Sequence, residues 1–432
     1  MKNKKFNTIM MSIIFSLLSC SPNSGTNGSF FEIPQAPSTP QTPNTPQTPN
    51  TPQTPSTPQT PEDNLPDTIP VIPNEPGFYV DGVNKGILLF ADILDWINNN
   101  AKNGAIYGIV LDKNITINPV TFSYSDKNVF IVLKGNTAGR TITVAKQGAL
   151  FKIRKGVRFG LQNNIILQGI NNNNSPLVEV DRGGLFIMND SEITGNISSG
   201  GTGGIWVGTG GALTINGGRI HNNKATQGDY ITGGGGIGIE ENGKFTMTGG
   251  EISENTSVLG GGISIRSNKI NITGGKILSN TATRSGGGIY LEISGANNYI
   301  EELLIKNLEI GNNKAGYNGG GIYSYLRQSS TLIIENTLIY GNIADSKLST
   351  EGKGGGVYSR GSSSSGNFIK KASGGIIYGT NTETKLQNIS KNGGNAVHHD
   401  IYLGLYIVDF KKRDTTVTEY VELNTNKLAE WE

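Results

Sequence analysis

This 432-residue chain has one cysteine and three histidines, so few of its side chains can bind a transition metal. A single cysteine cannot form a disulfide within the chain, and it excludes a zinc site of the Cys/His type. Charge is scarce too, since charged residues make up 16% of the chain and the net charge is +2. This balance gives no electrostatic reason to expect binding to nucleic acid. We expect no metal, no cofactor and no nucleic-acid partner.

The lone cysteine lies where the first residues give it a role. The chain begins with the basic segment MKNKK and the apolar run FNTIMMSIIFSLLS, which together are typical of a signal peptide over residues 1–19. Leu17, Leu18 and Ser19 precede Cys20 and resemble the lipobox of bacterial lipoproteins, which implies acylation of Cys20, palmitate included. The alternative is an ordinary secretory signal with a chance cysteine. The lipobox predicts export and a lipid anchor at the bacterial outer membrane.

Most of the 17 prolines lie between residues 21 and 76. From Thr39 to Pro61 the dipeptide Thr-Pro recurs every third residue, the period of a polyproline II helix. We predict a lipidated, disordered Pro/Thr-rich stalk over residues 20–76. It acts either as a spacer that lifts a domain off the membrane or as a tether without further role.

Folding is expected to begin near Phe78. Leu89, Ile93, Trp96 and Ile97 have helical spacing, so the sequence predicts a helix over 88–101. Strand-like runs follow it. We interpret residues 77–147 as an N-terminal cap that covers the first strands of the next region.

Beyond the cap the chain is rich in glycine, with 61 residues, and it repeats. A glycine-rich segment recurs before an apolar residue, as in GGGISI at 260–265, and Ile-x-x-Asn follows at a short distance. The first apolar residues of these repeats are Ile205, Ile237, Ile263, Ile289, Ile322 and Val357. The best copy places Ile263, Ile265, Ile270, Ile272 and Ile277 at period-two spacing.

Three short strands per repeat of about 26 to 35 residues indicate a solenoid, in which one turn is called a coil here. We predict an all-β fold: a single-stranded right-handed parallel β-helix with three strands per coil and roughly nine to eleven coils over 148–408. Residues 409–432 form a tail or cap. Asparagines at the end of the third strand are expected to stack as a structural ladder: Asn223, Asn255, Asn280, Asn313 and Asn342.

The glycine and asparagine signals resemble the GGAI and FxxN repeats of the chlamydial polymorphic outer-membrane protein family. More broadly, residues 77–408 are similar to the right-handed parallel β-helix, pectin-lyase-like lipoproteins of spirochaetes. The resemblance implies the fold, and adhesin activity for many family members. Those members end in a membrane β-barrel, whereas residues 401–432 have room for one or two strands, so a barrel is not expected here.

Pectin-lyase-like folds also include enzymes, which need clustered carboxylates. Asp181 and Arg182 on one predicted coil are candidates for proximity to Asp190 and Glu192 on the next coil. His398-His399-Asp400 looks like a catalytic fragment, but neighbouring residues on a strand point to opposite faces, and we assign no catalytic or metal residue. Other acids are interpreted as solvated residues at corners: Asp229, Glu240, Glu241, Glu251 and Glu254.

One outer column of the predicted coils is aromatic. Tyr290, Tyr323 and Tyr358 follow the first apolar residue in successive coils, with Tyr325, Arg327 and Arg360 nearby. Such a ladder either stacks on a sugar ring or stabilises neighbouring strands. We therefore expect a surface-exposed, non-catalytic lipoprotein for adhesion or interaction with a host or matrix protein or glycan. The alternative is a carbohydrate-binding or polysaccharide-degrading protein, a lyase or glycosidase.

Overall fold

The computed structural model describes residues 65–86, 89–136, 139–227, 233–293, 302–327, 331–347, 352–362, 368–371, 376–377, 387–391, 397–400 and 429–431. The chain divides into two units, 1–60 and 61–432, and every described residue belongs to the second. The predicted signal peptide, Cys20 and the Thr-Pro repeats lie outside the described residues. The described part has one helix, which is too short to span a membrane.

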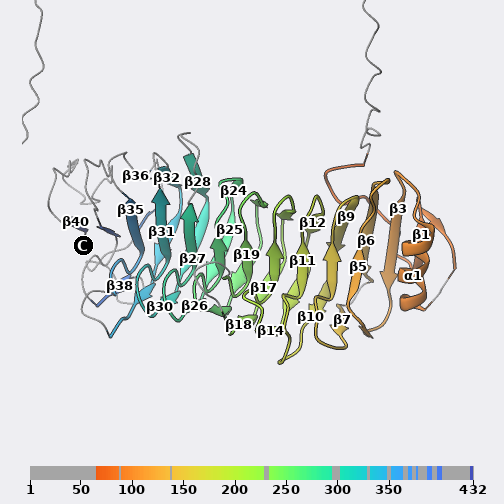
Figure 1. Ribbon diagram of the computed structural model, residues 1–432, viewed down its shortest axis with the longest axis horizontal. Coiled ribbons are helices and arrows are strands. Elements are labelled where there is room, and N and C mark those ends of the chain that lie inside the picture. The colour runs from red at the N-terminus through yellow and green to blue at the C-terminus, as the bar shows by residue number, and fades with distance from the viewer. Residues whose placement is uncertain are drawn as a thin grey trace, which may run out of the picture. The chain divides into compact units, whose positions relative to one another are not determined.

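The fold is all-β, and most strands belong to long sheets in which each strand pairs with its counterpart in the next repeat (Figure 1). Sheet A has twelve strands: β2 (Val83–Asn84), β1 (Gly77–Val80), β3 (Ile106–Leu111), β6 (Val129–Gly135), β9 (Val157–Gln162), β12 (Leu185–Met188), β16 (Ala212–Ile215), β20 (Lys244–Met247), β24 (Ile270–Ile272), β28 (Glu302–Lys306), β32 (Thr331–Glu335) and β36 (Phe368–Lys371).

Sheet B has ten strands: β37 (Ile376–Ile377), β33 (Leu338–Tyr340), β29 (Leu308–Gly311), β25 (Gly275–Leu278), β21 (Glu251–Ser253), β17 (Arg219–His221), β13 (Glu192–Thr194), β10 (Ile165–Gln168), β7 (Arg140–Val144) and β4 (Ile115–Ile117). Sheet C has eleven: β40 (Ala429–Trp431), β39 (Val397–Asp400), β35 (Val357–Ser362), β31 (Ile322–Arg327), β27 (Ile289–Ile293), β23 (Ile263–Ile265), β19 (Ile237–Ile239), β15 (Ile205–Val207), β11 (Val178–Val180), β8 (Phe151–Ile153) and β5 (Val120–Phe122).

A fourth sheet, D, adds a short strand to the three that the sequence predicts for each coil. Its seven two-residue strands each follow one of the Ile-x-x-Asn signals or its counterpart: β14 (Ile197–Ser198), β18 (Lys224–Ala225), β22 (Thr256–Ser257), β26 (Thr281–Ala282), β30 (Lys314–Ala315), β34 (Ile343–Ala344) and β38 (Ile389–Ser390). The chain visits the sheets in turn and returns each time in the same direction, so the pairing is parallel. This arrangement is consistent with a parallel β-helix-like solenoid.

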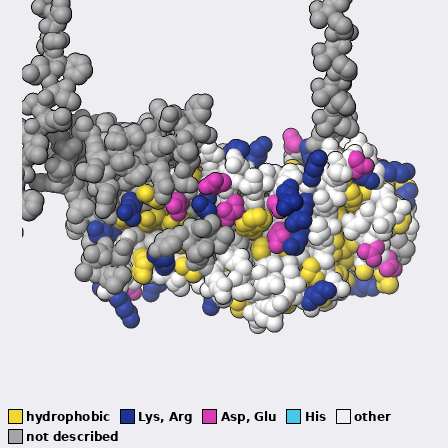
Figure 2. Space-filling model, viewed as in Figure 1, with side chains coloured by type: hydrophobic (Ala, Val, Ile, Leu, Met, Phe, Trp, Pro, Cys, Tyr) yellow, Lys and Arg dark blue, Asp and Glu magenta, His cyan; other side chains and the backbone are white. Residues whose placement is uncertain are grey.

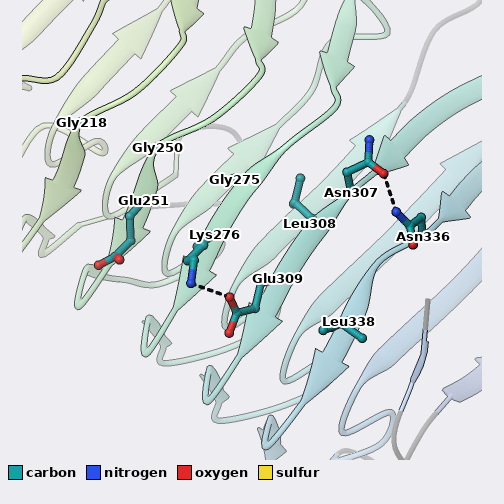
Figure 3. A pocket seen from close by; sticks show the side chains of 10 residues that line it. All are labelled: Gly218, Gly250, Glu251, Gly275, Lys276, Asn307, Leu308, Glu309, Asn336 and Leu338. Carbon is teal, nitrogen blue, oxygen red and sulfur yellow. Dashed lines mark hydrogen bonds and ion pairs between the residues drawn. The ribbon is translucent and has the colours of Figure 1, made fainter. Parts of the chain in front are cut away.

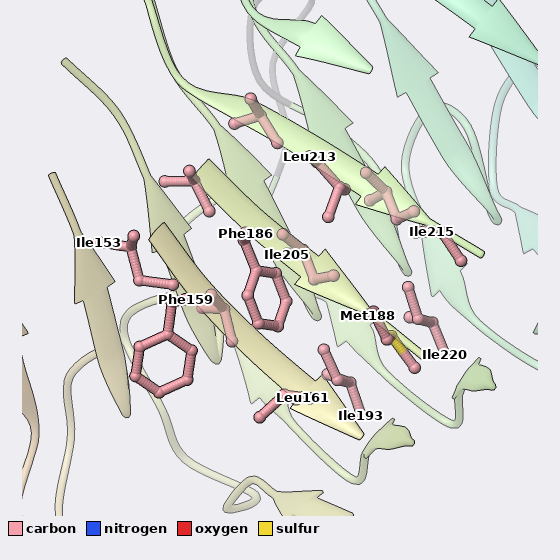
Figure 4. Packing of buried hydrophobic residues seen from close by; sticks show 14 of the residues in the cluster. Ile153, Phe159, Leu161, Phe186, Met188, Ile193, Ile205, Leu213, Ile215 and Ile220 are labelled. Carbon is pink, nitrogen blue, oxygen red and sulfur yellow. The ribbon is translucent and has the colours of Figure 1, made fainter. Parts of the chain in front are cut away.

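Aliphatic side chains fill the space between the sheets. Ile237, Ile263, Ile289 and Ile322 pair in one register column of sheet C, and all four are fully buried. Figure 4 shows the same packing nearer the N-terminus, where Phe159, Phe186 and Leu213 are successive register partners in sheet A and point into the core. Because successive repeats pair in the same register, equivalent residues of each repeat lie at the same depth in the core. This explains why isoleucine recurs at the same position of each repeat.

The predicted N-terminal helix exists, as α1 (Phe90–Asn100), two residues later than expected at its start. Ile93 and Ile97 are buried in the same cluster that fills the stacked coils. Trp96 is 36% exposed and makes an edge contact with Phe78, at 5.4 Å between ring centroids. Leu89 precedes the helix and is largely exposed. The helix therefore packs one apolar side against the cluster that fills the space between the sheets.

Residues 65–76, which composition assigned to the stalk, pack against the outer face of sheet A. We call this segment the strap. Leu65 and Ile72 are buried in a second apolar cluster with Val110, Phe130 and Ile187. Packed structure thus begins at least twelve residues before the position expected from the sequence.

Candidate functional site

The predicted asparagines lie side by side in the interior, at the corner between sheets B and D. Asn223, Asn255, Asn280, Asn313 and Asn342 are at most 1% exposed. From Asn223 on, each side-chain Nδ2 donates to Oδ1 of the next asparagine at 2.8–3.2 Å, ending at Asn388. Each backbone N–H donates to the same oxygen. The ladder therefore satisfies buried polar groups of the corners and has no amide left over for a ligand.

The tyrosines of the outer column of sheet C stack on one another. Ring centroids are 4.9 Å apart between Tyr290 and Tyr323 and 5.2 Å apart between Tyr323 and Tyr358. Tyr290 and Tyr358 are 5% and 3% exposed. Burial, followed by the charge of Glu292, raises the pKa of the Tyr290 phenol, which donates a hydrogen bond to that carboxylate. Because ring faces within the ladder are occupied by neighbouring rings, this geometry favours the stabilising role over sugar stacking.

The predicted acids are divided between sheets. Asp181 follows β11 of sheet C, whereas Glu192 opens β13 of sheet B, so the suggested pairing of their coils does not bring them to one face. Asp190 and Glu254 have positive φ, at 46° and 57°, as corner residues do. Asp229 lies outside the described residues.

On sheet B the charges alternate from coil to coil. Glu192, Arg219, Glu251, Lys276 and Glu309 occupy one register column. Arg219 and Glu251 are 3.4 Å apart, and Lys276 and Glu309 2.8 Å. Alternation prevents the like-charge repulsion that in-register stacking would otherwise impose.

A groove of about 800 Å³ runs beside this column, shown in Figure 3. Gly218, Gly250 and Gly275 lie along it, and the Lys276–Glu309 pair points along the outside of the strands. The hydrogen bond from Lys276, and then that from Tyr340, lowers the pKa of Glu309. The charged residues that line this groove, Glu251, Lys276 and Glu309, each form an ion pair with a residue of sheet B, so none of them is left without a partner for a ligand to bind.

His221 lies on the same face and contacts Glu192, a pairing that no local pattern in the sequence predicts. Its Nε2 lies 3.1 Å from Glu192 Oε2, and its Nδ1 lies 2.9 Å from Asn222 Nδ2 and 3.4 Å from Thr194 Oγ1. Thr194 and His221 are register partners 27 residues apart, so only the coil length brings them together. In the described ranges no three His, Cys, Asp or Glu residues gather as a metal site would need.

The second groove lies on the outer face of sheet C, and we call it the Trp206 groove. It has a volume of about 610 Å³ and is lined by Asp181, Arg182, Trp206, Thr209, Glu240, Glu241 and Arg266. The far end of the Trp206 indole lies over Gly208, where an added Cβ would be 2.4 Å from the indole Cη2. Gly238, the next residue in the register column of Trp206, has no side chain to cover the ring. An aromatic platform therefore borders an open, polar groove.

Ion pairs hold the polar wall of this groove in place. Arg154 Nε is 3.1 Å from Asp181 Oδ1, and Arg266 Nη1 is 3.5 Å from Glu240 Oε2. The side chains of Asp181, Glu240 and Arg266 are 12%, 19% and 18% exposed. Among the described residues that Figure 2 shows, acidic and basic side chains lie next to one another. Such a wall offers both donors and acceptors to a neutral polar ligand.

The terminal histidines occupy β39, where His398 pairs with Tyr358 and His399 with Ser359. His398 thus has the register position that the sequence predicted, one coil after Tyr358. Arg360 lies over the Tyr325 ring, 5.6 Å from its centroid.

Comparisons of the chain with models of protein families, with curated proteins and with solved structures found no match.

Proposed function

We propose that the chain is a membrane-anchored, surface-exposed bacterial lipoprotein that presents a non-catalytic solenoid for adhesion or interaction. The observation that carries the proposal is the Trp206 groove, in which an aromatic platform and fixed polar groups form a concave surface on the outer face of sheet C. Anchoring rests on the signal peptide and on Cys20, and localisation at the outer membrane follows from the same residues.

We also propose the finer architecture, a single-stranded right-handed parallel β-helix. Right-handed crossovers account for about 98% of connections between parallel strands of one sheet. The four sheets, visited in a fixed order, support one continuous winding. A crystal structure with left-handed coils would refute this part of the proposal.

The anchor is tested by expressing the 432-residue chain in a Gram-negative host with a clickable palmitate analogue. The wild-type chain should incorporate the label and enter the detergent phase, whereas Cys20→Ser should do neither. Loss of an epitope inserted after Cys20, on intact cells after protease treatment, would support surface exposure. Wild-type protein that does not incorporate the palmitate analogue would contradict the lipobox interpretation.

Binding is tested by probing immobilised host matrix proteins and glycans with the full chain. Trp206→Ala should abolish retention on any surface that holds the wild type. Leu338→Ala is the matched control, because Leu338 is an apolar residue of sheet B that is 41% exposed. Equal loss in both variants would show that the groove does not mediate adhesion.

The second candidate function is glycan binding, which the pairing of Trp206 with fixed carboxylates and guanidinium groups favours. Pyranose rings stack on flat aromatic faces, and their hydroxyls need donors and acceptors together. A glycan array decides between this candidate and a protein ligand. Assays for polysaccharide cleavage, run on the same glycans, test the degrading alternative.

A further inference from the structure

The outer face of sheet A has a register column in which large and small residues alternate. Tyr79, Gly108, Val132, Gly160 and Ile187 are successive partners on β1, β3, β6, β9 and β12. The two glycines leave gaps in an otherwise apolar surface. Neither has the positive φ that would itself require glycine, so the gaps need another explanation.

The strap fills both gaps. A Cβ added to Gly160 would lie 2.9 Å from Ile69 Cγ1, and one added to Gly108 would lie 3.0 Å from Ile72 Cγ2. Ile69 is half-buried and Ile72 is 4% exposed. Val71, between them, is 98% exposed. The strap therefore inserts two of its isoleucines and turns the intervening valine to solvent.

The spacing of these isoleucines fits the spacing of the strands. The strap contains Pro66, Pro70, Pro73 and Pro76, which favour the polyproline II conformation, with three residues per turn and about 3.1 Å per residue. Residues three apart then point the same way, roughly 9.3 Å apart. Gly108 and Gly160 are two strands apart, roughly 9.6 Å. The period of a proline-rich segment thus matches alternate strands of the sheet.

Two charged side chains of sheet A bind the strap, one near each of its ends. Lys134, 6% exposed, donates from Nζ to Ile72 O at 3.1 Å and to Asn74 Oδ1 at 2.6 Å. Arg158 donates from Nη1 to the carbonyls of Leu65 and Pro66 and lies 3.3 Å from Asp67. These contacts attach the strap to β6 and β9, strands inside the sheet.

We propose that the strap is a mechanical latch that carries tension from the N-terminal part of the chain into β6 and β9. Without it, a pull would act on Gly77, the first residue of β1, which pairs antiparallel with β2 and β3 near the sheet edge. Such a strand opens one pair after another. With the latch closed, a pull must dislodge the Arg158 contacts, the two inserted isoleucines and the Lys134 contacts before it reaches β1.

Single-molecule pulling tests the latch. The full chain is made without export, so that Cys20, its only cysteine, serves as one handle and a C-terminal tag as the other. Opening the latch frees residues 65–76, which have a contour length of about 40 Å at 3.3–3.6 Å per residue. In the wild type we expect a step equal to this contour length, corrected for the distance between Leu65 and Gly77 in the folded protein, before any cap strand unfolds.

The double variant Ile69→Ser/Ile72→Ser should lose the step, and Val71→Ser, the matched control in the same segment, should keep it. Gly160→Ala changes the sheet instead of the strap and should lower the force of the step. Hydrogen exchange of residues 65–76 at rest should be at least tenfold faster in the double variant than in Val71→Ser. The latch is overturned if the wild type shows no such step. It is also overturned if the double variant and Val71→Ser show the same step and the same exchange rates. The outcome does not depend on lipidation or on any ligand.

Discussion

Replacing Asn280 by alanine tests the physical basis of the asparagine ladder. Asn280 Oδ1 accepts from the backbone N–H and the Nδ2 of Asn255, both at 3.0 Å. Its Nδ2 donates to Ile252 O at 2.8 Å and to Asn313 Oδ1 at 3.0 Å. The variant removes all four bonds inside a corner from which water is excluded, since Asn280 is fully buried.

The cost can be worked from these bonds. Asn255 Nδ2 still reaches Ile220 O, and Asn313 Oδ1 still accepts from the Asn280 backbone N–H. The Asn255 backbone N–H and the Ile252 carbonyl each lose the bond that Asn280 provides. At roughly 1–3 kcal/mol for each buried polar group left without its partner, the free energy of unfolding should fall by about 4 kcal/mol.

Urea unfolding followed by circular dichroism and tryptophan fluorescence measures this change, and agreement of the two probes checks cooperativity in a repeat protein. Asn271→Ala is the control, because Asn271 is an exposed residue of β24 one strand earlier in the same repeat. It should change the free energy by less than about 0.5 kcal/mol. A cost below about 1 kcal/mol for Asn280→Ala would refute the claim that the side-chain amides satisfy the corners.

Three further predictions address other parts of the molecule. The lowered pKa of Glu309, caused first by Lys276, means that its contribution to stability is complete above the ordinary value of 4.5 and is lost as pH falls through the lowered pKa. The difference in melting temperature between wild type and Glu309→Gln should therefore shrink as pH falls from 6 towards about 3, and a constant difference would contradict the pairing. Tyr323→Ala should lower the free energy of unfolding by about 2–4 kcal/mol, because it removes the middle ring of the stack, while Tyr323→Phe should retain most of it in chemical denaturation. Gly261→Ala places a Cβ 2.4 Å from Gly287 O and should lower the free energy of unfolding by more than about 3 kcal/mol. Gly139→Ala, whose Cβ would have no atom closer than 3.6 Å, should leave the free energy of unfolding unchanged in the same assay. Equal effects of the two variants would show that the spacing between coils adjusts freely.

The core was predictable because its signal is local and repeated. In the copies at 235–255 and 261–280, the Gly-Gly-Ile and Ile-x-x-Asn signals each place one isoleucine inward, and the second also places an asparagine at a corner; stacking similar coils aligns them. Two-residue strands such as β26 are too short for a period to be visible, so sheet D could not be predicted.

The surface was less predictable because its contacts depend on register between distant residues. His221 meets Glu192 across 29 residues, and Arg266 meets Glu240 across 26, at intervals set by corners of variable length. The packing of the strap could not be predicted for a different reason. Its prolines continue the composition of the predicted stalk, so the sequence shows no change in proline content where the packed structure begins. The local sign of the change is that the Thr-Pro period ends at Pro61 and aliphatic residues begin at Leu65.

Because equivalent residues of adjoining repeats pair in sheet C, one repeat is the unit by which the length of the chain can change. Ile237 and Ile263 occupy equivalent positions in adjoining repeats, each after a pair of glycines with matching amide bonds to the next repeat. Excising the residues from Ile237 to Gly262 would join Gly236 to Ile263 and leave an unbroken stack. Unequal exchange between the coding segments of two such repeats would therefore shorten or extend the protein by whole modules while α1 and the strap stay the same.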